Sequence, residues 1–194
     1  MSTTIAQAES KPVATRRQPR RISKEQFLRD YAKREDGYKY EWNNGNVEKS
    51  EAMNQQQAIM QAVFLRHFIQ TAVFKAGGLF TAETDMDTSS VQTRRPDLAI
   101  YTAEQISRIK KGENQVAIWV AEVISPNDKA EDINKKLEEY FRAGVQVVWH
   151  IFPHSQKVDV YTSPDDVTIC RGQTFCSGAP ALPDLQISAG ELFA

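Results

Sequence analysis

The chain has 194 residues, of which 41% are hydrophobic and 25% charged. This is the composition of a globular protein large enough for one domain with a sizeable core. No apolar run approaches the ~18 residues of a membrane span, and the N-terminus lacks the apolar core of a signal peptide, so we expect a cytoplasmic protein. Two cysteines, Cys170 and Cys176, are too few for a disulfide scaffold and match no usual zinc-ligand spacing.

The net charge of −1 is unevenly distributed along the chain. Residues 1–21 carry a charge of +4, which leaves −5 for the remainder. A segment so poor in apolar residues is typical of a disordered solubilising leader, although an arm that contacts phosphates has the same composition. We expect a disordered basic tail over residues 1–22 and one domain over residues 23–194.

The first part of this domain predicts a helix followed by a hairpin. A capping-box pattern begins a helix that we expect over residues 24–33. Residues 38–42 then alternate between aromatic and charged side chains. This pattern predicts a strand with the aromatic side chains on one face and Lys39 and Glu41 on the other. An Asn-Gly turn folds this strand back onto residues 46–49.

A long helix is predicted next. Residues 52–76 have the apolar periodicity of one continuous helix, and the pair Gly77-Gly78 ends it. A strand is expected over residues 79–85, and a polar turn region follows as far as Thr93.

The second half of the domain reads as strands around one crossover helix. Strands are expected over residues 97–101, 116–124 and 145–152, and a helix over residues 129–143 connects the last two. That connection predicts a right-handed βαβ unit. An antiparallel pair, a final extended segment and a short helix complete an α/β fold with a mixed sheet.

Two carboxylates lie within these apolar strands. Asp97 begins one strand directly after Pro96, and Glu122 is a lone acid among the aliphatic residues of the central strand. Burying a carboxylate is unfavourable unless a partner compensates it, and Mg²⁺ is a cation that prefers carboxylate oxygens. Glu122 also lies near the C-terminal end of its strand, where sites form in open α/β sheets.

The crossover helix offers a lysine to these acids. At about 100° per residue, Lys136 falls at the margin of the apolar face beside Tyr140, whereas Lys135 faces solvent. Asp132 lies one turn before Lys136. Two acids and a lysine suit phosphodiester hydrolysis, in which a metal activates water and a lysine offsets developing charge. The structural alternative is a turn-capping aspartate and an ion pair between Glu122 and Lys136.

The joint pattern of these residues is similar to that of a known family. Its pieces are Arg95-Pro-Asp97, Val120-Ala-Glu122-Val-Ile-Ser-Pro126, Asp132, Lys136, Tyr140 and Trp149, with Tyr40-Glu41 upstream and Glu191-Leu-Phe193 at the end. Over residues 23–194 the chain resembles the Uma-type restriction endonuclease family of the PD-(D/E)XK nuclease superfamily. The resemblance implies a restriction-endonuclease-like core, with a central mixed β-sheet flanked by helices, and an enzyme that hydrolyses DNA with Mg²⁺ or Mn²⁺.

The resemblance also implies roles for individual residues. Asp97 and Glu122 would be the catalytic, metal-binding acids. Ile124 stands where the superfamily usually has a lysine, so Lys136 is the expected replacement. Glu41 would match an early acid that some members add to the metal shell, although a plain surface acid fits its place on the hairpin equally well.

Further positions are expected to support this site. Asp132 and Tyr140 would lie beside the catalytic residues, and Arg94 and Arg95 would contact nucleic acid. Relatives often have a histidine at the start of the early helix, where Gln56 would have to replace it. A glutamine can form hydrogen bonds there but cannot shuttle a proton near neutral pH.

Two functions stay open at this point. One is a metal-dependent DNA endonuclease; the other is a nuclease-fold module that binds nucleic acid or a protein partner with little or no cleavage. The retained acids and lysine favour the first, while the altered histidine position and the acidic body favour the second. A small-molecule enzyme is disfavoured because the chain has no glycine motif for a cofactor. Restriction-like nucleases commonly cut both strands as dimers, so a homodimer is expected.

Overall fold

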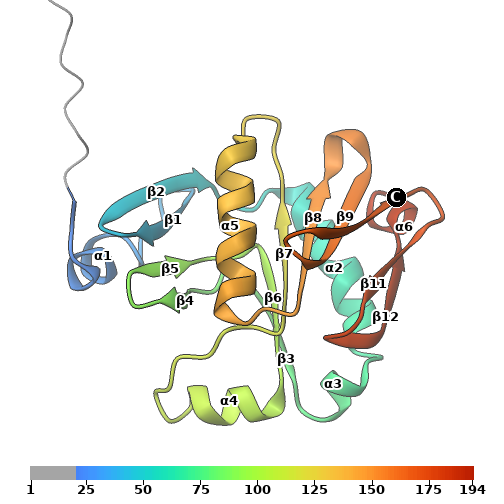
Figure 1. The fold of residues 1–194 in the computed structure, drawn as a ribbon, viewed down its shortest axis with the longest axis horizontal. Coiled ribbons are helices and arrows are strands. Elements are labelled where there is room, and N and C mark those ends of the chain that lie inside the picture. The colour runs from blue at the N-terminus through green and yellow to red at the C-terminus, as the bar shows by residue number, and fades with distance from the viewer. Residues whose placement is uncertain (1–20) are drawn as a thin grey trace, which may run out of the picture.

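The structure is a computed structural model that describes residues 21–194. The basic tail predicted for residues 1–22 therefore lies almost entirely outside the described residues. Across the described part of the chain, no helix combines the length and apolarity needed to cross a membrane. Three sheets and six α-helices make up the fold of this part (Figure 1).

The helices are α1 (Lys24–Asp30), α2 (Gln55–Phe68), α3 (Ala72–Lys75), α4 (Ala103–Ile109), α5 (Ala130–Ala143) and α6 (Ala189–Leu192). The strands are β1 (Tyr38–Asn43), β2 (Asn46–Glu51), β3 (Leu79–Ala82), β4 (Met86–Ser89), β5 (Gln92–Arg94), β6 (Leu98–Tyr101), β7 (Trp119–Val123), β8 (Val147–Phe152), β9 (Lys157–Ser163), β10 (Asp166–Arg171), β11 (Phe175–Gly178) and β12 (Leu182–Ser188).

A six-stranded mixed sheet forms the centre of the molecule, in the order β10-β9-β8-β7-β6-β3. Strands β7 and β8 are parallel and are joined through α5, and the other neighbouring pairs are antiparallel. Helix α5 covers one face of the sheet and α2 lies on the opposite face (Figure 1). The predicted α/β architecture with a central mixed sheet is therefore confirmed.

The two faces of this sheet bury different side chains. On the α2 side, the ring of Phe64 lies 5.3 Å from Trp119 and 5.4 Å from Trp149, measured between ring centroids. On the α5 side, Val120 belongs to a second buried cluster. Because side chains alternate along a strand, Glu122 shares the face of Val120 and projects toward α5.

A second sheet, in the order β2-β1-β5-β4, lies beside the first (Figure 1). It contains the predicted hairpin and a second hairpin, β4–β5, in the region expected to be a turn. Tyr40 and Trp42 pack with Phe27 of α1. The opposite face, which carries Lys39 and Glu41, is also buried: the two residues are 6% and 7% exposed. A surface position for Glu41 is therefore wrong.

The expectation of one helix over residues 52–76 is also wrong. Helix α2 ends at Phe68, and α3 begins after Thr71, whose hydroxyl donates to the Phe68 carbonyl oxygen at 2.7 Å. The carboxylate of Asp184 accepts a hydrogen bond from the Ala72 N–H at 2.6 Å. A partner from a distant part of the chain thus stabilises a second helix start inside an apolar periodic segment.

Candidate active site

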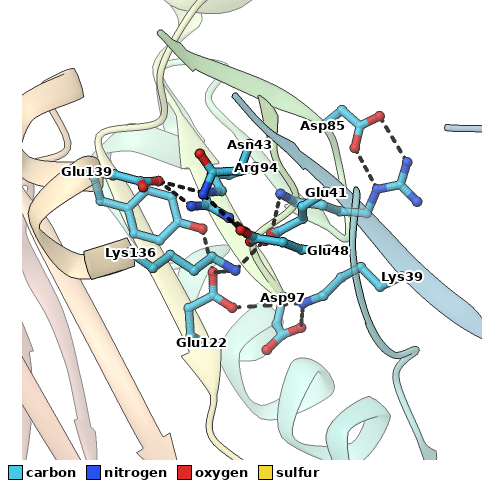
Figure 2. A network of polar contacts seen from close by, with 12 residues as sticks. Lys39, Glu41, Asn43, Glu48, Asp85, Arg94, Asp97, Glu122, Lys136 and Glu139 are labelled. Carbon is cyan, nitrogen blue, oxygen red and sulfur yellow. Dashed lines mark hydrogen bonds and ion pairs between the residues drawn. The ribbon is translucent and has the colours of Figure 1, made fainter. Parts of the chain in front are cut away.

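Glu122 is the centre of a buried polar network that joins both sheets to α5 (Figure 2). Its Oε1 atom accepts a hydrogen bond from the Tyr140 hydroxyl and lies 2.9 Å from Nζ of Lys136. The same ammonium lies 2.8 Å from Oε1 of Glu41 on β1. Lys135 instead pairs with the exposed Glu131. Of the two adjacent lysines, the structure brings only Lys136 to the acids.

Asp97 directs one oxygen to the backbone and the other to a lysine. Its Oδ2 accepts a hydrogen bond of 2.6 Å from the Val123 N–H, which ties the carboxylate to the end of β7. Its Oδ1 lies 2.6 Å from Nζ of Lys39, and that ammonium lies 3.8 Å from Oε2 of Glu122. Asp97 and Glu122 therefore face the same point, and Lys39 stands at that point (Figure 2).

Glu41 is held by three cationic or N–H groups. Its Oε1 accepts from the Arg95 N–H at 2.7 Å as well as from Lys136, and its Oε2 lies 3.2 Å from Arg94. Burial alone would raise the pKa of this carboxyl, but the charges of Lys136, Lys39 and Arg94 outweigh burial and lower its pKa to about 2. Glu41 therefore stays ionised at neutral pH.

The two arginines expected to contact nucleic acid are engaged with carboxylates. Arg94 is 3% exposed. Its guanidinium donates hydrogen bonds to Glu139, at 2.6 Å, and to Glu41 and Glu48. Arg95 forms a two-pronged ion pair with Asp85, at 2.6 and 2.9 Å. The Arg94 guanidinium therefore organises acids of the site, whereas Arg95 reaches Glu41 only through its backbone N–H.

The negative charges of Glu122 and its neighbouring carboxylates keep the lysines and the tyrosine of the network protonated. Burial lowers the pKa of Lys39 and of Lys136, but the neighbouring carboxylates reverse this effect, with Glu122 the strongest, so the pKa of each lysine is raised. Burial and the charge of Glu122 raise the pKa of Tyr140 well above its ordinary value. Both lysines are therefore ammonium ions, and Tyr140 remains a hydrogen-bond donor.

The donor chemistry of this cluster fits a hard divalent cation. Asp97 and Glu122 supply carboxylate oxygens, and Mg²⁺ is commonly held by one or two carboxylates together with waters and substrate phosphate. Within residues 21–194, however, no three His, Cys, Asp or Glu side chains gather closely enough to hold a metal ion. Glu41, the expected third ligand, is bound to Arg94 and Lys136. Asp97 and Glu122 are accordingly the pair that could hold the cation.

Two of the expected supporting residues lie away from the network. Asp132 is exposed on the first turn of α5. Gln56 lies at the start of α2 and lines a cavity of about 430 Å³, whose wall also contains Val123, Ile124 and His154. This cavity adjoins the site through Val123, the residue that fixes Asp97.

Two polar residues near the site were not anticipated from the sequence. The first is Lys39, and the only indication of its place in the sequence was that it shares a strand face with Glu41. The second is His150, which pairs in register with Glu122 on the neighbouring strand and whose ring lies 5.0 Å from that of Tyr161. Burial lowers the pKa of His150 to about 4, so its imidazole is neutral at pH 7.

Comparison with known proteins identifies a similar family and a similar fold. Residues 24–190 match the model of the Uma2 family, described as "Putative restriction endonuclease". A crystal structure from Anabaena variabilis ATCC 29413, described as "a putative nuclease belonging to DUF820", has a similar fold with a TM-score of 0.68. The two sequences are 18% identical, and the similarity covers 79% of this chain and 89% of that one. No curated protein matches this sequence.

Proposed function

Because this chain belongs to the Uma2 family, we propose that it is a divalent-metal-dependent DNA endonuclease that hydrolyses phosphodiester bonds. The observation that supports this proposal most directly is the convergence of Asp97 and Glu122 on one cation position. The two acids come from neighbouring segments of the central sheet, and Lys136 lies on the other side of Glu122.

In this proposal Asp97 and Glu122 would hold Mg²⁺ or Mn²⁺, and the bound metal would supply Lewis acidity toward a phosphate oxygen and a lowered pKa for a bound water. The chain fixes both acids in advance, since Val123 N–H orients Asp97 and the Tyr140 hydroxyl orients Glu122. Such preorganisation avoids the free-energy cost of reorienting the charged groups during the reaction.

Lys136 is the proposed stabiliser of charge on the phosphate. Its ammonium is ionised and lies 2.9 Å from Glu122, so it is held next to the proposed cation position. Ile124, the residue at the position usual for lysine, is apolar and cannot take this role. Gln56, in the adjoining cavity, could contribute hydrogen bonds to a bound strand but no proton transfer.

Cleavage of supercoiled plasmid tests the proposal. We expect the wild-type protein to nick the plasmid with Mg²⁺ or Mn²⁺, and Asp97→Asn and Glu122→Gln to abolish nicking while their unfolding transitions stay cooperative. Asp165→Asn is the matched control, because it makes the same change of charge at an exposed turn. This variant should cut like the wild type. Intact DNA with every divalent metal tried would refute cleavage. DNA binding without cleavage would instead identify a nuclease-fold binding module.

We also propose that the active form is a homodimer in which each protomer cuts one strand, as is common among restriction-like nucleases. Sedimentation at the protein concentration used for cleavage measures this directly. A monomer that makes double-strand cuts at that concentration would exclude the dimer.

A further inference from the structure

The two acids of the site each have one oxygen fixed by the scaffold and one directed at Lys39. Oδ2 of Asp97 is bonded to the Val123 N–H, and Oε1 of Glu122 is bonded to Tyr140 and Lys136. The remaining oxygens are Oδ1 of Asp97, 2.6 Å from Nζ of Lys39, and Oε2 of Glu122, 3.8 Å from it. Within residues 21–194, no other hydrogen bond or ion pair reaches these two oxygens.

Lys39 is therefore positioned like an ion between two ligands. Its side chain is 7% exposed and extends from β1 of the second sheet to the acids of the central sheet (Figure 2). Its amine is an ammonium ion, as the neighbouring carboxylates require. The positive charge of Lys39 thus compensates the negative charge of the two oxygens that would otherwise bind a metal cation.

A divalent cation and this ammonium would compete for the same oxygens. Mg²⁺ binds carboxylate oxygens at about 2.0–2.1 Å. A cation that close to Oδ1 of Asp97 would lie within about 5 Å of Nζ as Lys39 now stands, and like charges at this separation in a buried site repel strongly. Lys39 would have to withdraw before both oxygens could bind the metal.

We propose that Lys39 is a built-in competitor of the divalent cation, which occupies the space between Asp97 and Glu122 until the metal displaces it. This inference rests on the proposed metal site but not on cleavage. Lys39 would then set the metal concentration at which the site is loaded.

Metal binding measured without DNA tests this proposal. Titration of Mn²⁺ into the purified full-length protein, followed by calorimetry and by the electron paramagnetic resonance of free Mn²⁺, gives the dissociation constant. We expect Lys39→Met to tighten Mn²⁺ binding by about tenfold or more, which corresponds to about 1.4 kcal/mol. Lys39→Arg keeps a cation at the position and should not tighten it.

Lys135→Met is the matched control for charge. It also removes one positive charge from α5, but from an exposed ion pair with Glu131 that touches neither acid of the site. We expect it to change Mn²⁺ affinity by less than about threefold, because a solvent-exposed, screened charge repels a bound cation only weakly. Equal tightening by the two variants would overturn the competition, as would unchanged or weaker binding by Lys39→Met.

Two further measurements keep the test decisive. If Lys39→Met does not unfold cooperatively, Lys39→Gln, which is neutral and can still bond a carboxylate, takes its place with the same expectation. A crystal structure of the wild-type protein with Mn²⁺ should show Nζ of Lys39 no longer in contact with Oδ1 of Asp97. Mn²⁺ bound between the two acids with that contact intact would overturn the proposal, and so would failure of every variant to bind Mn²⁺. A protein that binds Mn²⁺ as described but leaves DNA intact would retain this inference and lose only the proposed nuclease activity.

Discussion

The hydroxyl of Tyr140 donates a hydrogen bond to Oε1 of Glu122, the same oxygen that lies 2.9 Å from Lys136. Tyr140 and Lys136 lie one turn apart on α5, so a single helix face supplies both partners. Rotation or loss of this helix would remove both groups from Glu122 together.

Tyr140→Phe removes the hydroxyl but keeps the buried ring. A charged acceptor loses one of its partners, and we expect the free energy of unfolding to fall by about 1–3 kcal/mol. Urea denaturation measures the change. Tyr161→Phe is the control, because the described residues include no hydrogen-bond partner for the Tyr161 hydroxyl; it should change stability by less than about 0.5 kcal/mol. Similar losses in both variants would contradict a specific role of the Tyr140 hydroxyl.

Adjacent lysines on α5 provide a sharp comparison for cleavage. Lys136→Met should reduce plasmid nicking by about 100-fold or more, because a preorganised charge beside the reacting phosphate is lost. Lys135→Met removes only an exposed pair with Glu131 and should leave the nicking rate within about twofold of the wild type. Initial rates under identical metal concentrations measure both. Equal rates for the two variants would exclude Lys136 from the reaction.

Arg94 should be a large contributor to stability. Arg94→Met leaves Glu41 and Glu139 buried without their shared cation, and such a loss costs about 3–5 kcal/mol. Arg108→Met is the exposed counterpart, since it breaks a surface pair with Glu104 and should cost less than about 0.5 kcal/mol. Thermal and urea unfolding of both variants check the difference, and a small effect of Arg94→Met would show that the carboxylates find other partners.

His150 should make stability depend on pH between about 6.5 and 4. Burial lowers its pKa in the folded protein from 6.5 to about 4, so within this window the unfolded chain binds a proton that the folded protein excludes. Stability therefore falls as the pH falls, by on the order of 3 kcal/mol in total, and this effect is absent above the unfolded pKa. His150→Gln should flatten the profile over the same window, measured by urea unfolding at pH 4.5 and 7.0. Identical slopes for the wild type and this variant would contradict the prediction.

The central part of the site followed from local rules. Strand alternation placed Glu122 on a buried face, and the helical period turned Lys136 rather than Lys135 toward it. Both rules depend only on the geometry of one element. The structure brings Glu122 and Lys136 into contact, and Tyr140 joins them, as the sequence pattern predicts.

What the sequence did not predict depends on contacts between distant segments. Alternation showed that Lys39 and Glu41 share a face, but not that a second sheet turns this face toward α5. The break between α2 and α3 depends on Asp184, more than 100 residues away. Strands β4 and β5 are largely polar, so neither periodicity nor apolar content distinguished them from a turn.

The division of the site between two sheets has a consequence for fragments of the chain. Lys39 and Glu41 belong to the sheet formed by β1, β2, β4 and β5, whereas Glu122 and Lys136 come from β7 and α5. Cutting the chain near Pro96, where it passes between the sheets, would separate Asp97 and Glu122 from Lys39, and Glu139 from Arg94. Only reassociation of the two pieces would return these cations to the acids, so fragment complementation should weaken as the salt concentration rises.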